Sequence, residues 1–247
     1  MRIMIVAALR ARLPLVLMFT VSQAWAGVAL EFETRTSSTA SYQFRGRALI
    51  DGANARYDVL NGAHPVFNPQ ITIISRDGGQ NLIVIDHRQR TWFMRRTGSM
   101  SGPLSTWKAP GQTANSHGWV KNTRAEEASE VIAGQPTTKY TTSMDYTIDM
   151  NIEGEKLKAH VVVEATTWMM ESKGVTALPY GLHFGLKSGF ASIDESVAKR
   201  FGGKGIPLRQ LVTVTRTIAD GDPIVEKFEL NVDRVSEEKT APSVFQA

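Results

Sequence analysis

The sequence YTTSMDYTIDMNI, at residues 140–152, alternates between two kinds of side chain. Its even-numbered positions are mostly apolar or aromatic, whereas its odd-numbered positions are all polar. A period of two residues is typical of a β-strand that buries one face. At about 3.3 Å per residue the strand would be roughly 40 Å long, so the stretch predicts a broad sheet.

A second alternating stretch, at residues 157–167, follows Glu153-Gly154 and predicts an antiparallel hairpin with a tight turn. The register that sets apolar residues opposite one another pairs Met150 with Leu157, Ile148 with Ala159, Tyr146 with Val161 and Met144 with Val163. On the polar face the same register sets Asp149 across from Lys158 and Asn151 across from Lys156. A slip of one residue would set each apolar row against a polar one.

The first 26 residues have the pattern of an export signal. Arg2, Arg10 and Arg12 precede an apolar run at residues 13–21, and Ala24-Trp25-Ala26 offers the small residues that a signal peptidase recognises. The arginines leave the apolar stretch too short for a membrane anchor, which needs about 20 apolar residues. We therefore expect cleavage after Ala26 and a periplasmic mature protein, residues 27–247, with no membrane anchor.

Charge and cysteine content narrow the function. Removal of residues 1–26 would lower the net charge from +4 to +1, because that segment holds three arginines and no acidic residue. A nearly neutral protein lacks the dense positive surface that non-specific nucleic-acid binding requires, so no nucleic-acid partner is expected. The chain has no cysteine, so disulfides and a lipidated N-terminal cysteine are excluded, and a buried core must supply the stability.

The remaining chain is read mostly as strands. Residues 28–96 predict a meander with turns at Asp51-Gly52 and Asn61-Gly62, and residues 206–218 and 224–235 predict a second hairpin. Residues 71–74 and 82–85 are apolar on both faces, which predicts a part of the sheet that is covered on both sides.

Two stretches depart from the strand pattern. Residues 97–128 have no usable periodicity and predict a long irregular loop. Residues 176–203 predict a helical insert, in which the apolar residues of the helices include Leu182, Leu186, Val197 and Phe201. Because hairpins rather than crossovers connect the strands, the fold class is mainly antiparallel β. We expect a single domain built as one curved sheet or half-barrel, with the helical segment packed on its concave face.

Three segments mark strand starts and the C-terminus: EVIAGQPTTKY at residues 130–140, KGIPLR at residues 204–209 and PSVF at residues 242–245. With them the chain resembles exported bacterial proteins that have the LolA/LolB-like fold of lipoprotein localisation factors, particularly a DUF4412-like group. The resemblance covers most of residues 28–245. It implies an unclosed β-barrel whose concave face is plugged by helices and can hold acyl chains, in proteins that carry or sense lipids or lipoproteins.

Sequence patterns of catalysis and metal binding are absent. There is no HExxH pair, and Gly202-Gly203-Lys204-Gly205 lacks the strand and spacing of a phosphate-binding loop. The five histidines have no helical metal-ligand spacing: His64, His87, His117, His160 and His183. We therefore expect neither an enzyme nor a cofactor or metal.

Two functions fit these observations. In the first, the protein is a soluble periplasmic carrier or sensor that holds a lipid or other hydrophobic ligand in the concave face. In the second, it is a structural or interaction module that fills its own concavity and binds another envelope protein. The ligand cavity of the first function is expected to be lined by Met144, Tyr146, Ile148, Met150, Ala159, Val161, Leu182, Leu186, Val197 and Phe201.

The export signal is tested by the mass of the mature chain. Protein purified from the periplasm should begin at Gly27, because the small residues before it fit signal peptidase. Intact-mass measurement checks this, and a periplasmic protein that keeps residues 1–26 would contradict it.

Overall fold

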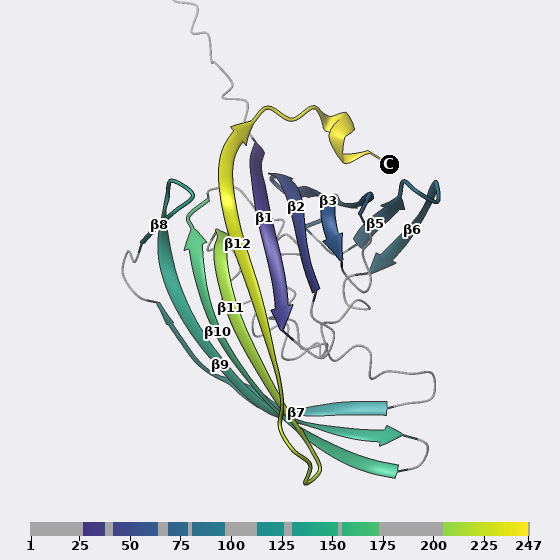
Figure 1. The fold of residues 1–247 in the computed structure, drawn as a ribbon, viewed down its shortest axis with the longest axis vertical. Helices are drawn as coiled ribbons and strands as arrows, with labels where there is room; N and C mark the ends of the chain where they lie inside the picture. Colours follow the sequence, from purple (N-terminus) through teal and green to yellow (C-terminus); the bar gives the residue numbers. More distant parts are fainter. Residues whose placement is uncertain are drawn as a thin grey trace, which may run out of the picture.

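The computed structural model describes residues 27–37, 42–63, 69–78, 81–96, 113–125, 130–152, 155–172 and 205–246. Strands make up nearly all of this part of the chain (Figure 1). In the N-terminal half they are β1 (Gly27–Ser37), β2 (Tyr42–Asp51), β3 (Asn54–Ala63), β4 (Ile71–Ser75), β5 (Asn81–Asp86) and β6 (Thr91–Arg96). In the C-terminal half they are β7 (Thr113–Ala125), β8 (Glu130–Ile132), β9 (Gln135–Ile152), β10 (Glu155–Met170), β11 (Ile206–Ile218) and β12 (Ile224–Glu238), followed by the short 3₁₀ helix η4 (Pro242–Phe245).

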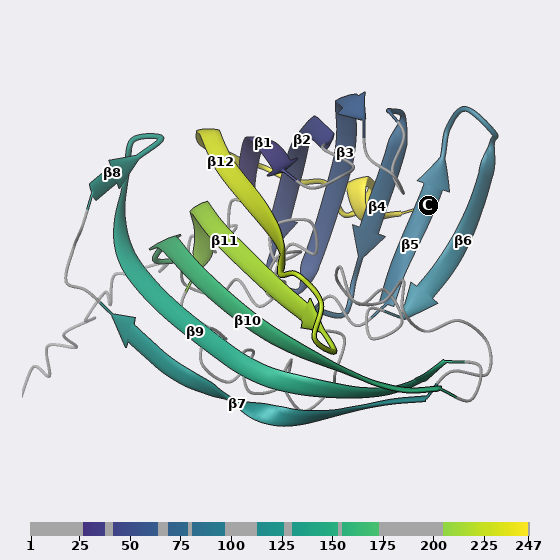
Figure 2. The same cartoon turned by 60° about the horizontal axis from the view of Figure 1, so that its bottom comes forward.

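All twelve strands of the described residues belong to one antiparallel sheet. Eleven of them follow the order β6-β5-β4-β3-β2-β1-β12-β11-β10-β9-β7, and β8 pairs with β9 beside β7. Strands β6 and β7 therefore end an unclosed sheet. The sheet is strongly curved, and the long strands β7, β9 and β10 sweep beneath the meander of β1 to β6 (Figure 2). This confirms the expected antiparallel fold class.

The long hairpin has the register that the alternating pattern predicts. Strands β9 and β10 pair Met150 with Leu157, Ile148 with Ala159, Tyr146 with Val161 and Met144 with Val163. On the other face Asp149 lies across from Lys158, and their charged groups are 4.0 Å apart. The hairpin is longer than expected, because β9 begins at Gln135, directly after the Ala133-Gly134 turn from β8. The Glu153-Gly154 turn lies outside the described residues.

The meander is also confirmed, with one correction. Strands β1 to β6 pair consecutively, and Gly52 turns β2 into β3 with a φ of 58°. Asn61-Gly62, however, does not form a turn, because both residues lie inside β3. The register between β2 and β3 shifts at Leu60, which is the extra residue of a β-bulge, and Gly62 adopts a φ of 103° after it. An Asn-Gly pair serves a bulge as well as a turn, so the dipeptide alone did not distinguish them.

The predicted irregular loop at residues 97–128 needs a second correction, since it contains β7 (Thr113–Ala125). The sequence of β7, TANSHGWVKNTRA, has no alternation, and its register to β9 shifts at Lys121. Its strand conformation is accounted for by pairing with β9 rather than by its own pattern. The predicted helical insert, residues 176–203, and its apolar residues Leu182, Leu186, Val197 and Phe201 lie outside the described residues.

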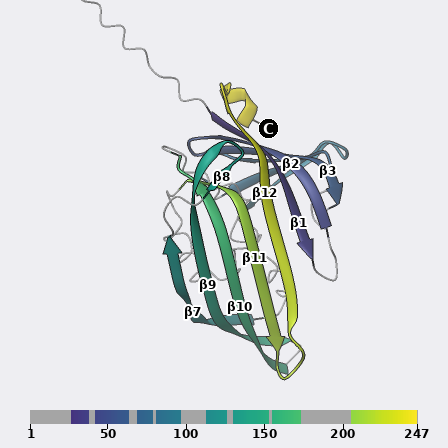
Figure 3. The ribbon, with the colours of Figure 1, turned by 60° about the vertical axis from the view of Figure 1, so that its left-hand side comes forward.

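Residues directly opposite one another in the ladders share a face of the sheet, which defines two faces. We name as the inner face the one that carries the register row Leu30, Ala48, Tyr57, Ile73 and Val84, all of them buried. The same face carries Val161 and Val214 on the long strands. The opposite, outer face carries exposed cross-strand ion pairs such as Arg45–Asp233 and Arg47–Glu238. Strands β9 to β12 run side by side along this curve (Figure 3).

One part of the outer face is apolar and is covered by the C-terminus. Ile74, Ala29 and Leu49 form a small cluster there with Phe245 of η4. All five residues of β4 are consequently buried, as the apolar run on both faces predicts. Hydrogen bonds also hold this C-terminal segment to the sheet. Arg76 donates to the Phe245 carbonyl over 2.6 Å, and Thr240 donates to Asp51 over 2.7 Å.

The bulge assignment can be tested with two alanine variants. A Cβ at position 62 would lie 2.2 Å from the carbonyl oxygen of Gln43, whereas a Cβ at Gly52, also at positive φ, would meet nothing within 4 Å. Gly52→Ala should therefore cost only the conformational strain, about 1 to 2 kcal/mol. Gly62→Ala should cost about 3 kcal/mol or more, because the backbone of β2 must also move. Urea unfolding measures both losses, and equal losses would contradict the bulge.

Candidate functional site

The inner face carries a continuous apolar cluster on the strands β9, β10 and β11. We name it the hairpin cluster, because the long hairpin provides most of it, and its members are Met144, Tyr146, Ile148, Ala159, Val161, Val163, Ala165, Val212 and Val214. Each member is at most 5% exposed. Four partly buried residues pack against it: Tyr140, Leu157, Ile218 and Phe228.

Local sequence accounts for this geometry. Alternation on β10 directs Ala159, Val161 and Val163 to one face, and β-branched residues suit the pleated surface of a strand. The register then sets Met144, Val163 and Val214 in one row across three strands, and Ile148, Ala159 and Ile218 in another. Small and branched side chains therefore cover β10 and β11 on this face, with the longer Met144 and Tyr146 beside them on β9.

The structure brings together five of the predicted site residues, Met144, Tyr146, Ile148, Ala159 and Val161. The backbone of Met150 lies in register with Leu157, but its side chain is not among those described. Leu182, Leu186, Val197 and Phe201 lie outside the described residues. The predicted lining did not include Val163, although the expected register set it opposite Met144, and it also lacked Ala165, Val212 and Val214. The alternation at residues 206–218 contains the signal for the last two.

A polar row separates the hairpin cluster from the main core. The main core is the larger inner-face cluster that includes Leu30, Phe32, Phe44, Tyr57 and Trp168. Between the two clusters, one register row places Thr34 on β1, Gln210 on β11 and Thr167 on β10, interrupted by Leu230 on β12.

All three polar side chains of this row are buried, and Gln210 donates to Thr167 over 3.2 Å. The hydroxyl of Thr34 has no hydrogen-bond partner among the described residues. Because buried polar groups cost free energy, this row marks the boundary of the main core rather than a part of it.

A buried ion pair borders the hairpin cluster on its other side. Arg216 of β11 lies across from Val161, and it forms an ion pair with Glu226 of β12 over 2.5 Å. The two side chains are 8% and 15% exposed. Sequence alternation places residue 216 on the inner face but does not explain why an arginine stands there.

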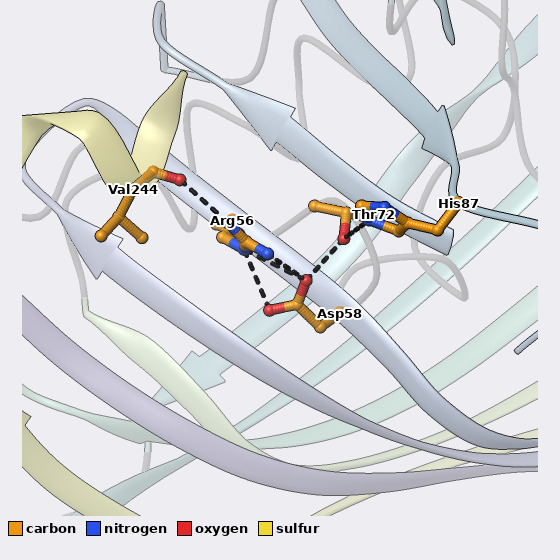
Figure 4. A network of polar contacts seen from close by, with 5 residues as sticks. All are labelled: Arg56, Asp58, Thr72, His87 and Val244. Atoms are coloured by element: carbon orange, nitrogen blue, oxygen red, sulfur yellow. Dashed lines mark hydrogen bonds and ion pairs between the residues drawn. The ribbon is translucent and has the colours of Figure 1, made fainter. Parts of the chain in front are cut away.

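A second polar network lies on the outer face of β3 and β4 (Figure 4). Asp58 accepts hydrogen bonds from the guanidinium of Arg56 over 3.0 and 3.1 Å and from the hydroxyl of Thr72 over 2.6 Å. The Thr72 hydroxyl also lies 2.9 Å from Nε2 of His87, and Arg56 donates to the carbonyl of Val244 over 3.2 Å.

The network combines a hydroxyl, a histidine and a carboxylate, but its order does not suit nucleophilic catalysis. Asp58 contacts the hydroxyl rather than the histidine, so it does not orient the imidazole as a base. Thr72 is 2% exposed, which keeps substrate from its oxygen. We interpret the network as a clamp that fixes η4 to the sheet through Arg56.

Within the described residues, no group of three or more histidine, aspartate or glutamate side chains is placed to hold a metal ion. His87 and His160 are exposed, and His160 lies 2.8 Å from Asp145 on the outer face. None of the helices in the described part of the chain is long and apolar enough to cross a membrane.

Comparison with known proteins finds no matching family model and no matching curated protein. Solved structures do match over about nine-tenths of both chains. A LolA superfamily protein from Nitrosomonas europaea is 10% identical, covers 90% of each chain and has a TM-score of 0.37. A domain described as an outer membrane lipoprotein-sorting protein, from Vibrio parahaemolyticus, is 9% identical with 91% coverage of each chain and a TM-score of 0.34.

A DUF1329 family protein from Desulfovibrio piger is 6% identical, covers 91% of each chain and also has a TM-score of 0.34. The chain is thus similar in structure to proteins of these groups. Structural similarity with such low TM-scores does not assign the chain to a family. We therefore infer its function from the side chains of its own sheet.

The clamp around Asp58 yields a stability prediction. Thr72→Val keeps the shape of the side chain but removes the donor to Asp58, and it should lower the free energy of unfolding by about 1 to 3 kcal/mol. Thr91→Val, at an exposed position of β6, is the control and should change little. Urea unfolding measures both, and a fully stable Thr72→Val variant would rule out the clamp.

Proposed function

We propose that the mature chain, residues 27–247, is a non-catalytic periplasmic protein that holds a lipid or another hydrophobic ligand against the hairpin cluster. The protein would be a single β domain that carries or senses this ligand. The observation that carries the proposal is the hairpin cluster itself, a continuous apolar surface on three adjacent strands that a polar row separates from the main core.

The composition of the two clusters supports this division of roles. The main core contains large rigid side chains, including Phe32, Phe44, Tyr57 and Trp168, and the rings of Phe32 and Phe44 meet edge to face at 6.2 Å. In the hairpin cluster, β10 and β11 contribute only alanines and valines, and Tyr146 is the one aromatic member. An apolar surface of small side chains suits an acyl chain, and the unbranched Met144 can adapt to chains of different shape.

The proposed lining extends the five residues that the structure brings together. It adds Met150 and, from the predicted helical insert, Leu182, Leu186, Val197 and Phe201. We also propose that the protein is related to the DUF4412-like group that its sequence resembles.

A specific observation also favours the second function, a module that binds another envelope protein. Strand β6 ends the sheet, and its side chains Trp92, Phe93 and Met94 are 64%, 45% and 61% exposed. A terminal strand with exposed large apolar side chains can add a strand from a partner.

Two measurements separate these functions. Native mass spectrometry followed by lipid extraction of the purified mature protein should find a bound lipid if the protein is a carrier. Fluorescence of N-phenyl-1-naphthylamine, a neutral apolar probe, should rise on binding and saturate at one site. A protein that carries no lipid and does not bind the probe would leave the interaction module as the function.

Two tryptophan variants test the location of the ligand. Ile148→Trp adds bulk to the hairpin cluster and should abolish probe binding with modest loss of stability. Thr147→Trp adds the same bulk to the outer face of the same strand, opposite His160, and should leave binding unchanged.

The stability of Ile148→Trp distinguishes a ligand site from a filled core. If the hairpin cluster is closely packed by the protein itself, the variant should lose about 1 to 3 kcal/mol in urea unfolding. Unchanged probe binding by a folded Ile148→Trp protein would place the ligand elsewhere.

A further inference from the structure

The ion pair Arg216–Glu226 stands at an unusual place on the inner face. The register row through Arg216 continues to Val161 and Tyr146, and the row through Glu226 continues to Val214, Val163 and Met144. Every other residue of these two rows on β9, β10 and β11 is a buried member of the hairpin cluster. A full charge of each sign therefore borders the hairpin cluster directly.

This ion pair differs from those on the outer face. Arg47–Glu238 also joins two strands, but its side chains are 44% and 42% exposed, so water solvates both charges. The side chains of Arg216 and Glu226 are 8% and 15% exposed. Removing two charges from water is costly, and apolar residues of similar size would often serve the fold equally well or better. The charges are therefore candidates for a role besides folding.

The ion pair also lies close to an exposed end of the sheet. Arg216 lies across from Ile224, the first residue of β12, which is 45% exposed, and Val225 beside it is 50% exposed. The turn between β11 and β12 at Asp220 and Gly221 is exposed as well, and it forms the lower end of the molecule in Figure 1. A polar group at Arg216 is thus near water, while an apolar group attached to it can extend over Val161 and Tyr146.

We propose that Arg216 binds the anionic head of an amphiphilic ligand whose acyl chain lies on the hairpin cluster. This inference rests on the proposed function and adds the chemistry of the ligand's head. The head carries anionic oxygens, as a fatty-acid carboxylate or the phosphate of a phospholipid does. The planar guanidinium, which stays charged at all relevant pH values, can donate two parallel hydrogen bonds to such a group.

Glu226 holds this position in the structure. Its carboxylate presents to Arg216 the same oxygens that a fatty acid would present, so the ligand head must replace it. Glu226 comes from the exposed start of β12, two residues after Ile224, where its side chain can turn to water. The protein's own carboxylate therefore competes with the ligand, and neutralising it should strengthen binding rather than weaken it.

The experiment compares two pairs of ligands that share an acyl chain and differ in charge. Oleate is paired with oleyl alcohol, and oleoyl lysophosphatidic acid is paired with monoolein. Each ligand displaces N-phenyl-1-naphthylamine from the full mature protein, below the concentration at which the ligand forms micelles. The wild-type protein should bind the charged member of at least one pair about tenfold or more tightly, as expected for a charge-assisted hydrogen bond. The pair with the larger preference identifies a carboxylate or a phosphate head.

Three variants locate the preference at Arg216. Arg216→Gln should lose the preference for the charged ligand while binding the neutral one as before. Glu226→Gln should bind the charged ligand several-fold more tightly, a gain that a merely structural ion pair would not produce. Arg209→Gln is the matched control, because it removes an arginine of the same strand that pairs with Glu130 over 3.0 Å, and it should behave as the wild type.

The outcomes separate the two proposals. If the wild-type protein binds none of the four ligands or the probe, the proposed function fails. If it binds charged and neutral ligands equally, or if Arg216→Gln keeps the preference, only the role of Arg216 is overturned. Because Arg216→Gln leaves Glu226 buried without its partner, the double variant Arg216→Gln with Glu226→Gln is measured in parallel. A folded double variant that still prefers the charged ligand would also overturn the proposal.

Discussion

The ladder between β1 and β12 is the interaction on which the architecture depends. Strands β2 to β6 lie on one side of it, and β11, β10, β9 and β7 lie on the other. The ladder joins Gly27, the first described residue, to Glu238 and continues over the full length of β1. Because it pairs the two ends of the chain, it can form only after the most distant segments meet, at a large cost in loop-closure entropy. Without it the meander and the long strands would be separate sheets with apolar faces open to water.

The parts of the fold that the sequence predicts are those with local signals. Alternation over residues 140–152 and 157–167 was sufficient to predict the register of β9 and β10, since any slip would place Asp149 among apolar side chains. Strand β7 has no such signal and is a strand because β9 offers it an edge. The bulge at Leu60 is a similar case, because an Asn-Gly dipeptide suits either a turn or a bulge and only the pairing with β2 decides between them. The pairing of β1 with β12 is non-local and has no sequence signature.

The candidate site was predictable to the extent that it follows from alternation. Residues Met144, Tyr146, Ile148, Ala159 and Val161 were expected on one face and lie together there. Their neighbours Val212 and Val214 come from a strand more than 45 residues further along the chain, and the order of strands, which places β11 beside β10, decides that contact. Arg216 was missed for a different reason. An alternating pattern tolerates an occasional arginine as an exposed residue, so burial and the partner Glu226 had to be seen before the residue could be interpreted.

The division of the inner face would let one sheet combine a stable core with the proposed binding surface. A chain without cysteine must obtain its stability from buried apolar area, and the main core, which joins aliphatic side chains to a few aromatic ones, provides it. A ligand that binds only the folded protein stabilises it wherever it lies, so what separate clusters would protect is the packing of the main core. The row of Thr34, Gln210 and Thr167 interrupts the apolar contact between the two clusters. With that interruption, a ligand could leave the hairpin cluster without removing apolar contacts from the main core.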